Sequence, residues 1–158
     1  MDTVIWIMVI LILIIVLIVF GINVNHKLSE LEVAIKQEWD KLKELENKKF
    51  ELAVKLVNEQ EYDESVQQIT NLITRYSNAD NPHYYIDCYI DLTRMISKFK
   101  MSEELQNAFN CNKELFDKTR IDYNNLVLNF NSRIKTFPIN FIAKLLGYSK
   151  YIYFRTED

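Results

Sequence analysis

Side chains that could hold a metal ion or act as nucleophiles are few and scattered in this chain of 158 residues. Cys88 and Cys111 lie far apart and outside any C-x-x-C motif. With only two histidines, His26 and His83, the chain cannot assemble a zinc site of the common Cys/His spacing. Both cysteines lie among apolar neighbours in helix-like segments, so we expect ordinary buried thiols.

Four carboxylates gather after the first long helical segment: Glu59, Glu61, Asp63 and Glu64. They could bind a divalent cation, but a solvated turn with Asp63 capping the next helix is the favoured interpretation. Nucleotide and hydrolase motifs (G-x-x-x-x-G-K-S/T, H-E-x-x-H, G-x-S-x-G) do not occur, and two glycines cannot build a phosphate cradle. We therefore expect no catalytic residues, no cofactor and no metal site.

Composition points to helices. Two glycines and two prolines provide few β-turns, and 22 acidic against 19 basic residues argue against a nucleic-acid partner. Residues 4–22 carry no charged or strongly polar side chain, and as a helix these 19 residues would span roughly 28 Å, which matches a bilayer core. Trp6 suits an interfacial anchor.

A retained membrane anchor is favoured over a cleaved signal peptide, because no Lys or Arg precedes the apolar run and no small-x-small site follows it. We expect residues 1–24 to form the anchor and residues 25–158 a helical domain. The lysines that follow the run outnumber those before it, which predicts an external N-terminus and a cytoplasmic domain. These lysines are Lys27, Lys36, Lys41 and Lys43.

Two heptad series predict a long helix with a coiled-coil seam, continuous with the anchor. One series is Leu28, Ile35, Leu42, Lys49 and Leu56, and the other is Leu31, Glu38, Leu45 and Leu52. A second apolar stripe runs from Tyr62 to Tyr76, and a third helix is expected from Pro82 to Phe99. Ser102 should begin a fourth helix, although helices three and four could instead be one.

Amphipathic helices joined by short connections bury their stripes against each other as antiparallel neighbours. We therefore predict an all-α fold in which an N-terminal transmembrane helix is followed by an antiparallel bundle of three or four long helices. Pro138 should end the fourth helix at Phe137 and open a short helix that Gly147 closes in the left-handed conformation.

The C-terminal third resembles the end of the bacterial LemA family. There a Y-N-x-x-V-x-x-Y/F-N helix runs into F-P-x-N-x-x-A-x-x-x-G-F/Y and an aromatic tail. The matching residues are Tyr123, Asn124, Phe130, Asn131, Phe137, Pro138, Asn140, Ala143 and Gly147. Upstream, Trp39 and the basic pair Lys48 and Lys49 match a second stretch, but Ala53 and Val54 replace the family's Ile-Pro, and its Gln/Glu-rich middle block is not recognisable.

The resemblance implies a bacterial, membrane-anchored helical bundle that acts as an interaction or scaffold protein without established catalysis. Its partners would be the lipid bilayer, further copies of the chain or other membrane proteins. The alternatives are a regulatory or adaptor partner of a membrane metallopeptidase and a ligand-sensing bundle.

The aromatic tail allows two interpretations. Its rings could seal one end of the bundle, or they could rest on the inner leaflet together with neighbouring basic side chains. For the second interpretation the candidate membrane-interface residues are Lys144, Lys150, Tyr151 and Phe154.

Overall fold

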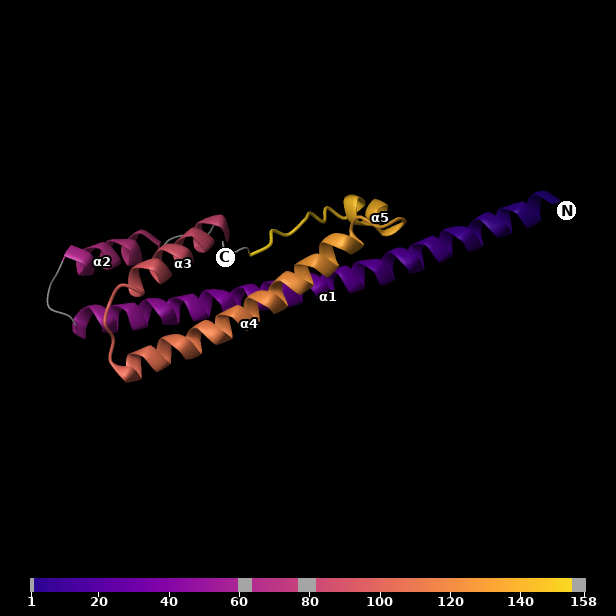
Figure 1. Ribbon diagram of the computed structural model, residues 1–158. Helices are drawn as coiled ribbons and strands as arrows, with labels where there is room; N and C mark the ends of the chain where they lie inside the picture. Colours follow the sequence, from indigo (N-terminus) through magenta and orange to yellow (C-terminus); the bar gives the residue numbers. More distant parts are fainter. Residues whose placement is uncertain (1, 60–63, 77–81, 155–158) are drawn as a thin grey trace. The chain divides into compact units, whose positions relative to one another are not determined.

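A computed structural model describes residues 2–59, 64–76 and 82–154 of the chain, and these residues form five helices and no strand (Figure 1). The all-α prediction is confirmed. The helices are α1 (Asp2–Glu59), α2 (Glu64–Tyr76), α3 (Pro82–Ile96), α4 (Glu103–Arg133) and α5 (Ile139–Leu145).

The chain divides into two compact units. Unit 1 comprises residues 1–36 and 126–151, and unit 2 comprises residues 37–125 and 152–158. Helices α1 and α4 each contribute residues to both units. The boundary predicted at residue 24 divides a membrane anchor from a folded domain, whereas the two units are divided by compactness. The anchor boundary therefore stays a prediction.

Helix α1 has 58 residues without a break, as expected from the absence of proline and glycine between Ile22 and Gln60. Its N-terminal part is long and apolar enough to cross a membrane, and residues 4–20 there are all exposed. β-Branched residues weaken a helix in water, but a helix in lipid has no solvent competing for its backbone hydrogen bonds. The composition of this segment therefore suits an apolar surrounding.

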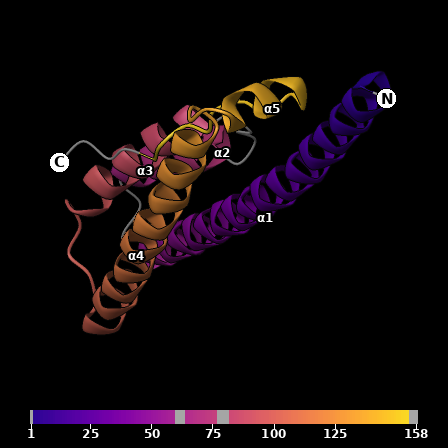
Figure 2. The same cartoon turned by 90° about the vertical axis from the view of Figure 1, so that its right-hand side faces the viewer.

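Four helices share the apolar core of unit 2. Helix α1 contributes Leu52, Ala53 and Leu56, and α2 contributes Ile69; the other members are Leu92, Ile96, Leu105 and Phe109 from α3 and α4. Helices α2 and α3 lie side by side in both views (Figures 1 and 2). The bundle expected from the apolar stripes is thus observed here with four helices.

The connection after α3 shows that helices three and four are separate. Helix α3 ends at Ile96, three residues before the predicted end, and α4 begins at Glu103. The hydroxyl of Ser102 accepts a hydrogen bond from the backbone N–H of Leu105 at 3.4 Å, which is the cap that the sequence predicted. The predicted cap Asp63 lies outside the described residues.

The seam of α1 in unit 2 differs from the predicted heptad. The buried residues advance by steps of four and three through Leu42, Glu46, Lys49, Ala53 and Leu56. Leu45, in the second predicted series, is only half-buried. A helix covered by several neighbours presents a broader face than a two-stranded seam does. The stripe therefore includes the positions four residues after Leu42 and Lys49, and Glu46 is buried with it.

The end of α4 also differs from the prediction. The helix ends at Arg133, four residues before Phe137. The backbone N–H groups of Lys135 and Thr136 donate to the carbonyls of Ser132 and Arg133, three residues back, at 3.2 and 3.1 Å. The last turn is therefore tightened toward a 3₁₀ pattern before the proline is reached.

Candidate functional site

Two places in the described residues combine unusual exposure or burial with polar chemistry. One is the surface of α5 and its flanking turns in unit 1, and the other is a group of buried polar side chains in unit 2.

In unit 1, Asn131 binds the backbone of the C-terminal tail through both ends of its amide. Its Nδ2 donates to the carbonyl of Tyr151 at 2.8 Å, and its Oδ1 accepts from the N–H of the same residue at 3.0 Å. Asn131 itself is buried, and the ring of Phe130 packs edge-on against Tyr148 and Tyr151 at 5.9 and 5.2 Å between centroids. The C-terminal end of the segment that carries α5 is thus attached to α4.

Two tyrosine hydroxyls attach the same segment to α1. Tyr148 donates to Oδ1 of Asn25, and Tyr151 donates to a carboxylate oxygen of Glu32, each at 2.9 Å. Hydrogen bonds from Lys36 and Tyr151 lower the pKa of Glu32, so that this carboxylate is ionised and accepts both. Tyr151 is half-buried by these contacts.

Helix α5 is closed by the left-handed glycine that the sequence predicted. Gly147 has a φ of 79°, its N–H donates to the carbonyl of Lys144 at 3.3 Å, and the N–H of Tyr148 donates to that of Ala143 at 2.9 Å. This pair of bonds is the Schellman arrangement. Ala143 is buried, so one side of α5 faces the protein.

The opposite side of α5 is apolar and uncovered. The exposed fractions of Phe137, Phe141 and Leu145 are 83, 73 and 78%. Positions 137, 141 and 145 follow at intervals of four, and α5 contains Phe141 and Leu145. Residues four apart in a helix lie on the same side. Such a cluster of large, exposed apolar side chains on a protein surface marks an interaction site.

An apolar groove of about 630 Å³ lies between α5 and α1 within unit 1. Its wall on α1 includes Leu17, Ile18 and Ile22, which belong to the apolar run, and its other wall includes Phe137, Phe141 and Leu145. We call it the α5 groove. The uncovered side of α5 and the end of the apolar run therefore form one continuous surface.

The basic side chains of the segment that carries α5 form no ion pair with a carboxylate in the described part of the chain. Residues 126–151 contain four basic side chains and no acidic one: Arg133, Lys135, Lys144 and Lys150. All four are exposed, and none of them forms an ion pair within the described residues. Lys144 lies next to Leu145 in α5, so a positive charge borders the apolar side.

In unit 2, Asn124 binds the tail in the way that Asn131 does in unit 1. Its amide exchanges two hydrogen bonds of 2.8 Å with the backbone of Phe154, and the hydroxyl of Tyr123 donates to the carbonyl of Ile152 at 2.9 Å. The Trp39 ring lies 5.6 Å from that of Tyr123 and 6.1 Å from that of Phe154.

Phe154 is therefore a core residue. Only 1% of its surface is exposed, and its ring also packs edge-on against Phe116 at 5.4 Å. The prediction that Phe154 contacts the membrane is wrong, because its ring is buried in unit 2. The sequence does not indicate that the tail turns this ring inward. For Lys144 and Lys150, which are exposed, the prediction stands.

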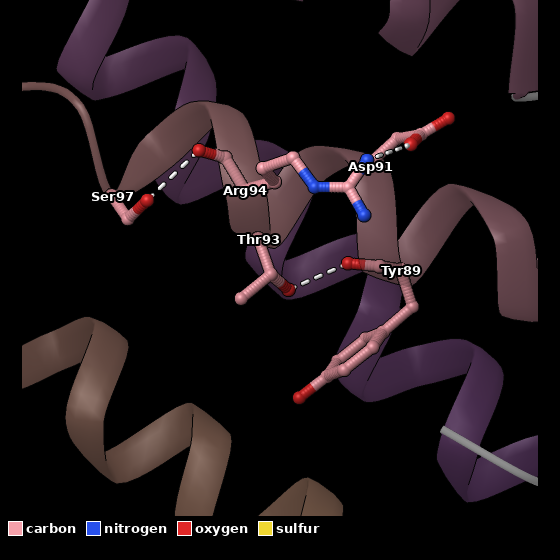
Figure 3. A network of polar contacts seen from close by, with 5 residues as sticks. All are labelled: Tyr89, Asp91, Thr93, Arg94 and Ser97. Carbon is pink, nitrogen blue, oxygen red and sulfur yellow. Dashed lines mark hydrogen bonds and ion pairs between the residues drawn. The ribbon is translucent and has the colours of Figure 1, made fainter. Parts of the chain in front are cut away.

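Buried polar side chains form the second place. Lys49 donates hydrogen bonds to the Thr93 hydroxyl and to the carbonyl of Tyr89, and its Nζ lies 3.5 Å from the centre of the Tyr89 ring. Figure 3 shows Thr93 donating in turn to the Tyr89 carbonyl, at 2.5 Å. On the same helix, Arg94 pairs with Asp91 at 3.4 Å, on the exposed side.

Glu46 lies one turn before Lys49 and is 1% exposed. Neither of its carboxylate oxygens has a hydrogen-bond partner among the described residues. Burial raises the pKa of Glu46 to about 8 against the opposing effect of Lys49, and burial lowers the pKa of Lys49 to about 8. Burial also raises the pKa of Tyr89 to about 12, so this phenol stays neutral.

A pocket of about 320 Å³ opens beside Lys49. Phe109 and Ile96 supply apolar wall, whereas Asn112 and Lys113 supply polar wall. Asn112 is buried and donates to the carbonyl of Leu45 at 3.0 Å, which explains why an amide interrupts the apolar stripe of α4. The pocket combines cationic and amide groups with an apolar interior.

The described part of the chain contains no group of three or more His, Cys, Asp or Glu side chains that could hold a metal ion. Of the acidic group after α1, Glu61 and Asp63 lie outside the described residues, and so does the side chain of Glu64. Cys111 is exposed, which corrects the expectation of a buried thiol; the Cys88 side chain is not described.

The family-motif residues fall into two groups. Trp39 meets Tyr123 in unit 2, and Phe130 and Asn131 meet the tail in unit 1. Lys49 is buried beside Tyr89, whereas its neighbour Lys48 is exposed. Pro138 and Asn140 are also exposed, and the Asn140 N–H donates to the Thr136 carbonyl at 2.8 Å.

Several polar residues were missed by the sequence reading, above all Glu46, Tyr89 and Asn25. Glu46 had a usable signal, because it occupies the position one turn from both Leu42 and Lys49 on the observed stripe. The partners of Tyr89 and Asn25 are distant in the chain, and nothing local indicates them.

Comparisons with protein-family models, with curated proteins and with solved structures find no match for this chain. Fold and site together define the class: the described residues form an all-α protein in which one helix is long and apolar enough to cross a membrane, and a helical bundle is built on the continuation of that helix.

Proposed function

We propose that this protein is a single-pass membrane protein whose helical bundle serves as an interaction or scaffold domain, of the kind that its resemblance to the LemA family implies. The supporting observation is the continuity of α1. Large apolar side chains of its N-terminal part are exposed in the described structure, and the same helix supplies buried residues to both units. Residues 1–24 are then a retained anchor and no catalytic activity is involved.

The orientation we propose has the N-terminus outside and the bundle in the cytoplasm. It rests on the lysines that follow the apolar run, with none before it. In this orientation the α5 groove lies at the cytoplasmic end of the span.

Cysteine accessibility tests the topology. Ser29 is exposed and is replaced by Cys in a full-length chain whose Cys88 and Cys111 are changed to Ser; Thr3→Cys provides the matched position on the other side. A membrane-impermeant maleimide should label Thr3→Cys in intact cells and Ser29→Cys only after permeabilisation. Labelling of Ser29→Cys in intact cells would contradict the topology, and extraction of the protein by alkaline carbonate would contradict the anchor.

A ligand-sensing bundle is the second candidate, and the pocket beside Lys49 favours it. The remaining alternative is an adaptor for a membrane metallopeptidase, which is supported only by the resemblance to the LemA family. Chemical cross-linking in native membranes followed by purification separates these functions. Oligomers of the chain support the scaffold, a stoichiometric protease supports the adaptor, and a co-purifying small molecule lost in Lys49→Met supports the sensor.

A further inference from the structure

We infer that the α5 groove is a second membrane contact: it takes the acyl chains of anionic phospholipids from the bilayer that α1 crosses, while Lys144 and the neighbouring cations bind the phosphates. This inference rests on the proposed membrane span. It adds a lipid class, a binding surface and the residues that form it.

The α5 groove adjoins the apolar run of α1. The groove shares Leu17, Ile18 and Ile22 with the apolar run, so lipid that surrounds the last turns of the span already touches one wall. The other wall consists of α5 side chains in the same unit. The last turns of the span and Phe141 therefore line the same apolar groove.

The apolar side of α5 is strongly exposed. In water, side chains as exposed as Phe137, Phe141 and Leu145 would each leave a large apolar area unburied. The side of α5 that carries Ala143 is covered by protein, so α5 has the two-sided character of an element lying in the plane of an interface. Phenylalanine and leucine are typical of the apolar side of such interfacial elements.

The segment that carries α5 is positively charged. Residues 126–151 carry four basic side chains and no acidic one, and none of the four has a carboxylate partner in the described residues. Basic side chains close to a membrane surface are attracted to anionic headgroups. Lys144 borders the apolar side of α5, where its methylene stem can lie along the acyl region while its ammonium reaches a phosphate.

The test uses the full-length protein in nanodiscs that contain a phosphatidylglycerol analogue with a diazirine in its acyl chain, diluted into phosphatidylcholine. After illumination, mass spectrometry maps cross-linked residues. We expect cross-links in residues 137–146 in addition to those in residues 4–22. The double variant Phe141→Asp plus Leu145→Asp should lose about tenfold of the α5 cross-links and keep those of the span.

Leu128→Asp is the matched control, because Leu128 is an exposed leucine of α4 in the same unit, with an exposed fraction of 55%. It should leave both sets of cross-links unchanged. Replacing phosphatidylglycerol by a phosphatidylcholine analogue should weaken the α5 cross-links, and Lys144→Glu plus Lys150→Glu should remove the difference between the two lipids.

The possible outcomes distinguish the lipid contact of α5 from the anchor formed by α1. Span cross-links without α5 cross-links would overturn the second contact and leave the anchor intact, whereas absence of both would overturn the anchor. Protein-to-protein cross-links at Phe141 in place of lipid ones would assign the groove to a second copy or another protein. Equal cross-linking by both lipids would overturn the assignment to anionic headgroups. Circular dichroism of the double variant, whose changed side chains are exposed, verifies that it is folded.

Discussion

Replacement of Glu46 by Gln should abolish most of the pH dependence of bundle stability between pH 5 and 7. The buried Glu46 carboxyl has a pKa of about 8 in the folded protein, against 4.5 when unperturbed. Above pH 4.5 the unfolded chain releases the proton while the folded chain keeps it. Stability contributed by this group is therefore complete below pH 4.5 and is lost as the pH rises toward 8.

The magnitude follows from the two pKa values. Between pH 5 and 7, deprotonation of this carboxyl stabilises the unfolded chain by about 1.4 kcal/mol per pH unit, while the folded chain keeps its proton. The free energy of unfolding should therefore fall by about 2–3 kcal/mol over this range. Lys49, with a folded pKa of about 8, stays protonated in both states over this range. The lowered pKa of Glu32 acts below this range.

The assay is urea unfolding of the full chain in detergent micelles, followed by the fluorescence of Trp39, which packs on Tyr123 and Phe154. Trp6→Phe removes the other indole. Glu44→Gln, at an exposed position two residues away, is the control and should keep the slope of the parent. An equal slope in Glu46→Gln and the parent would refute the assignment of a protonated buried carboxyl.

Three further predictions use the same unfolding assay. Phe116→Ala should destabilise the protein by about 3–5 kcal/mol, because its fully buried ring stacks on Tyr89 at 4.1 Å; unchanged stability would contradict its place in the core. Gly147→Ala should cost about 1–2 kcal/mol through the φ of 79° alone, since nothing lies within 4 Å of an added Cβ, and Gly147→Asn should cost less. Asn131→Asp should cost about 1–3 kcal/mol by removing the donor to Tyr151, and raised protease cleavage in the tail should accompany it.

Local patterns were sufficient for most helices. Long apolar periodicity without glycine or proline predicted α1 as one helix, and Ser102 marked the start of α4. Both depend on interactions between residues close in the chain. Helix ends were less accurate, since α4 tightens at Arg133 before Pro138 acts.

The polar interior could not be predicted in the same way. Lys49 was an exception in an apolar series, and whether such a lysine reaches solvent depends on which helices cover it. Here the Lys49 ammonium hydrogen-bonds to Thr93 and lies over the ring of Tyr89, both in α3. Neither partner is indicated by residues near position 49. For the tail, the packing interpretation is confirmed at Phe154, which lies in the core, whereas membrane contact of the exposed Phe137 and Phe141 stays a prediction.

The asparagines of the C-terminal motif have a chemical requirement that the sequence alone leaves open. Each pairs with both the N–H and the C=O of one tail residue, and an amide side chain can donate and accept at once, as a peptide group does. An aspartate would lack the donor, and an alanine would leave the tail backbone unsatisfied.

Their spacing follows from the geometry of the two segments they join. Seven residues of α-helix, from Asn124 to Asn131, rise roughly 10.5 Å, and three steps of extended chain, from Tyr151 to Phe154, cover roughly 10 Å. Seven residues are also close to two full turns of an α-helix, so the amides of Asn124 and Asn131 lie on the same side of α4, and both reach the tail backbone.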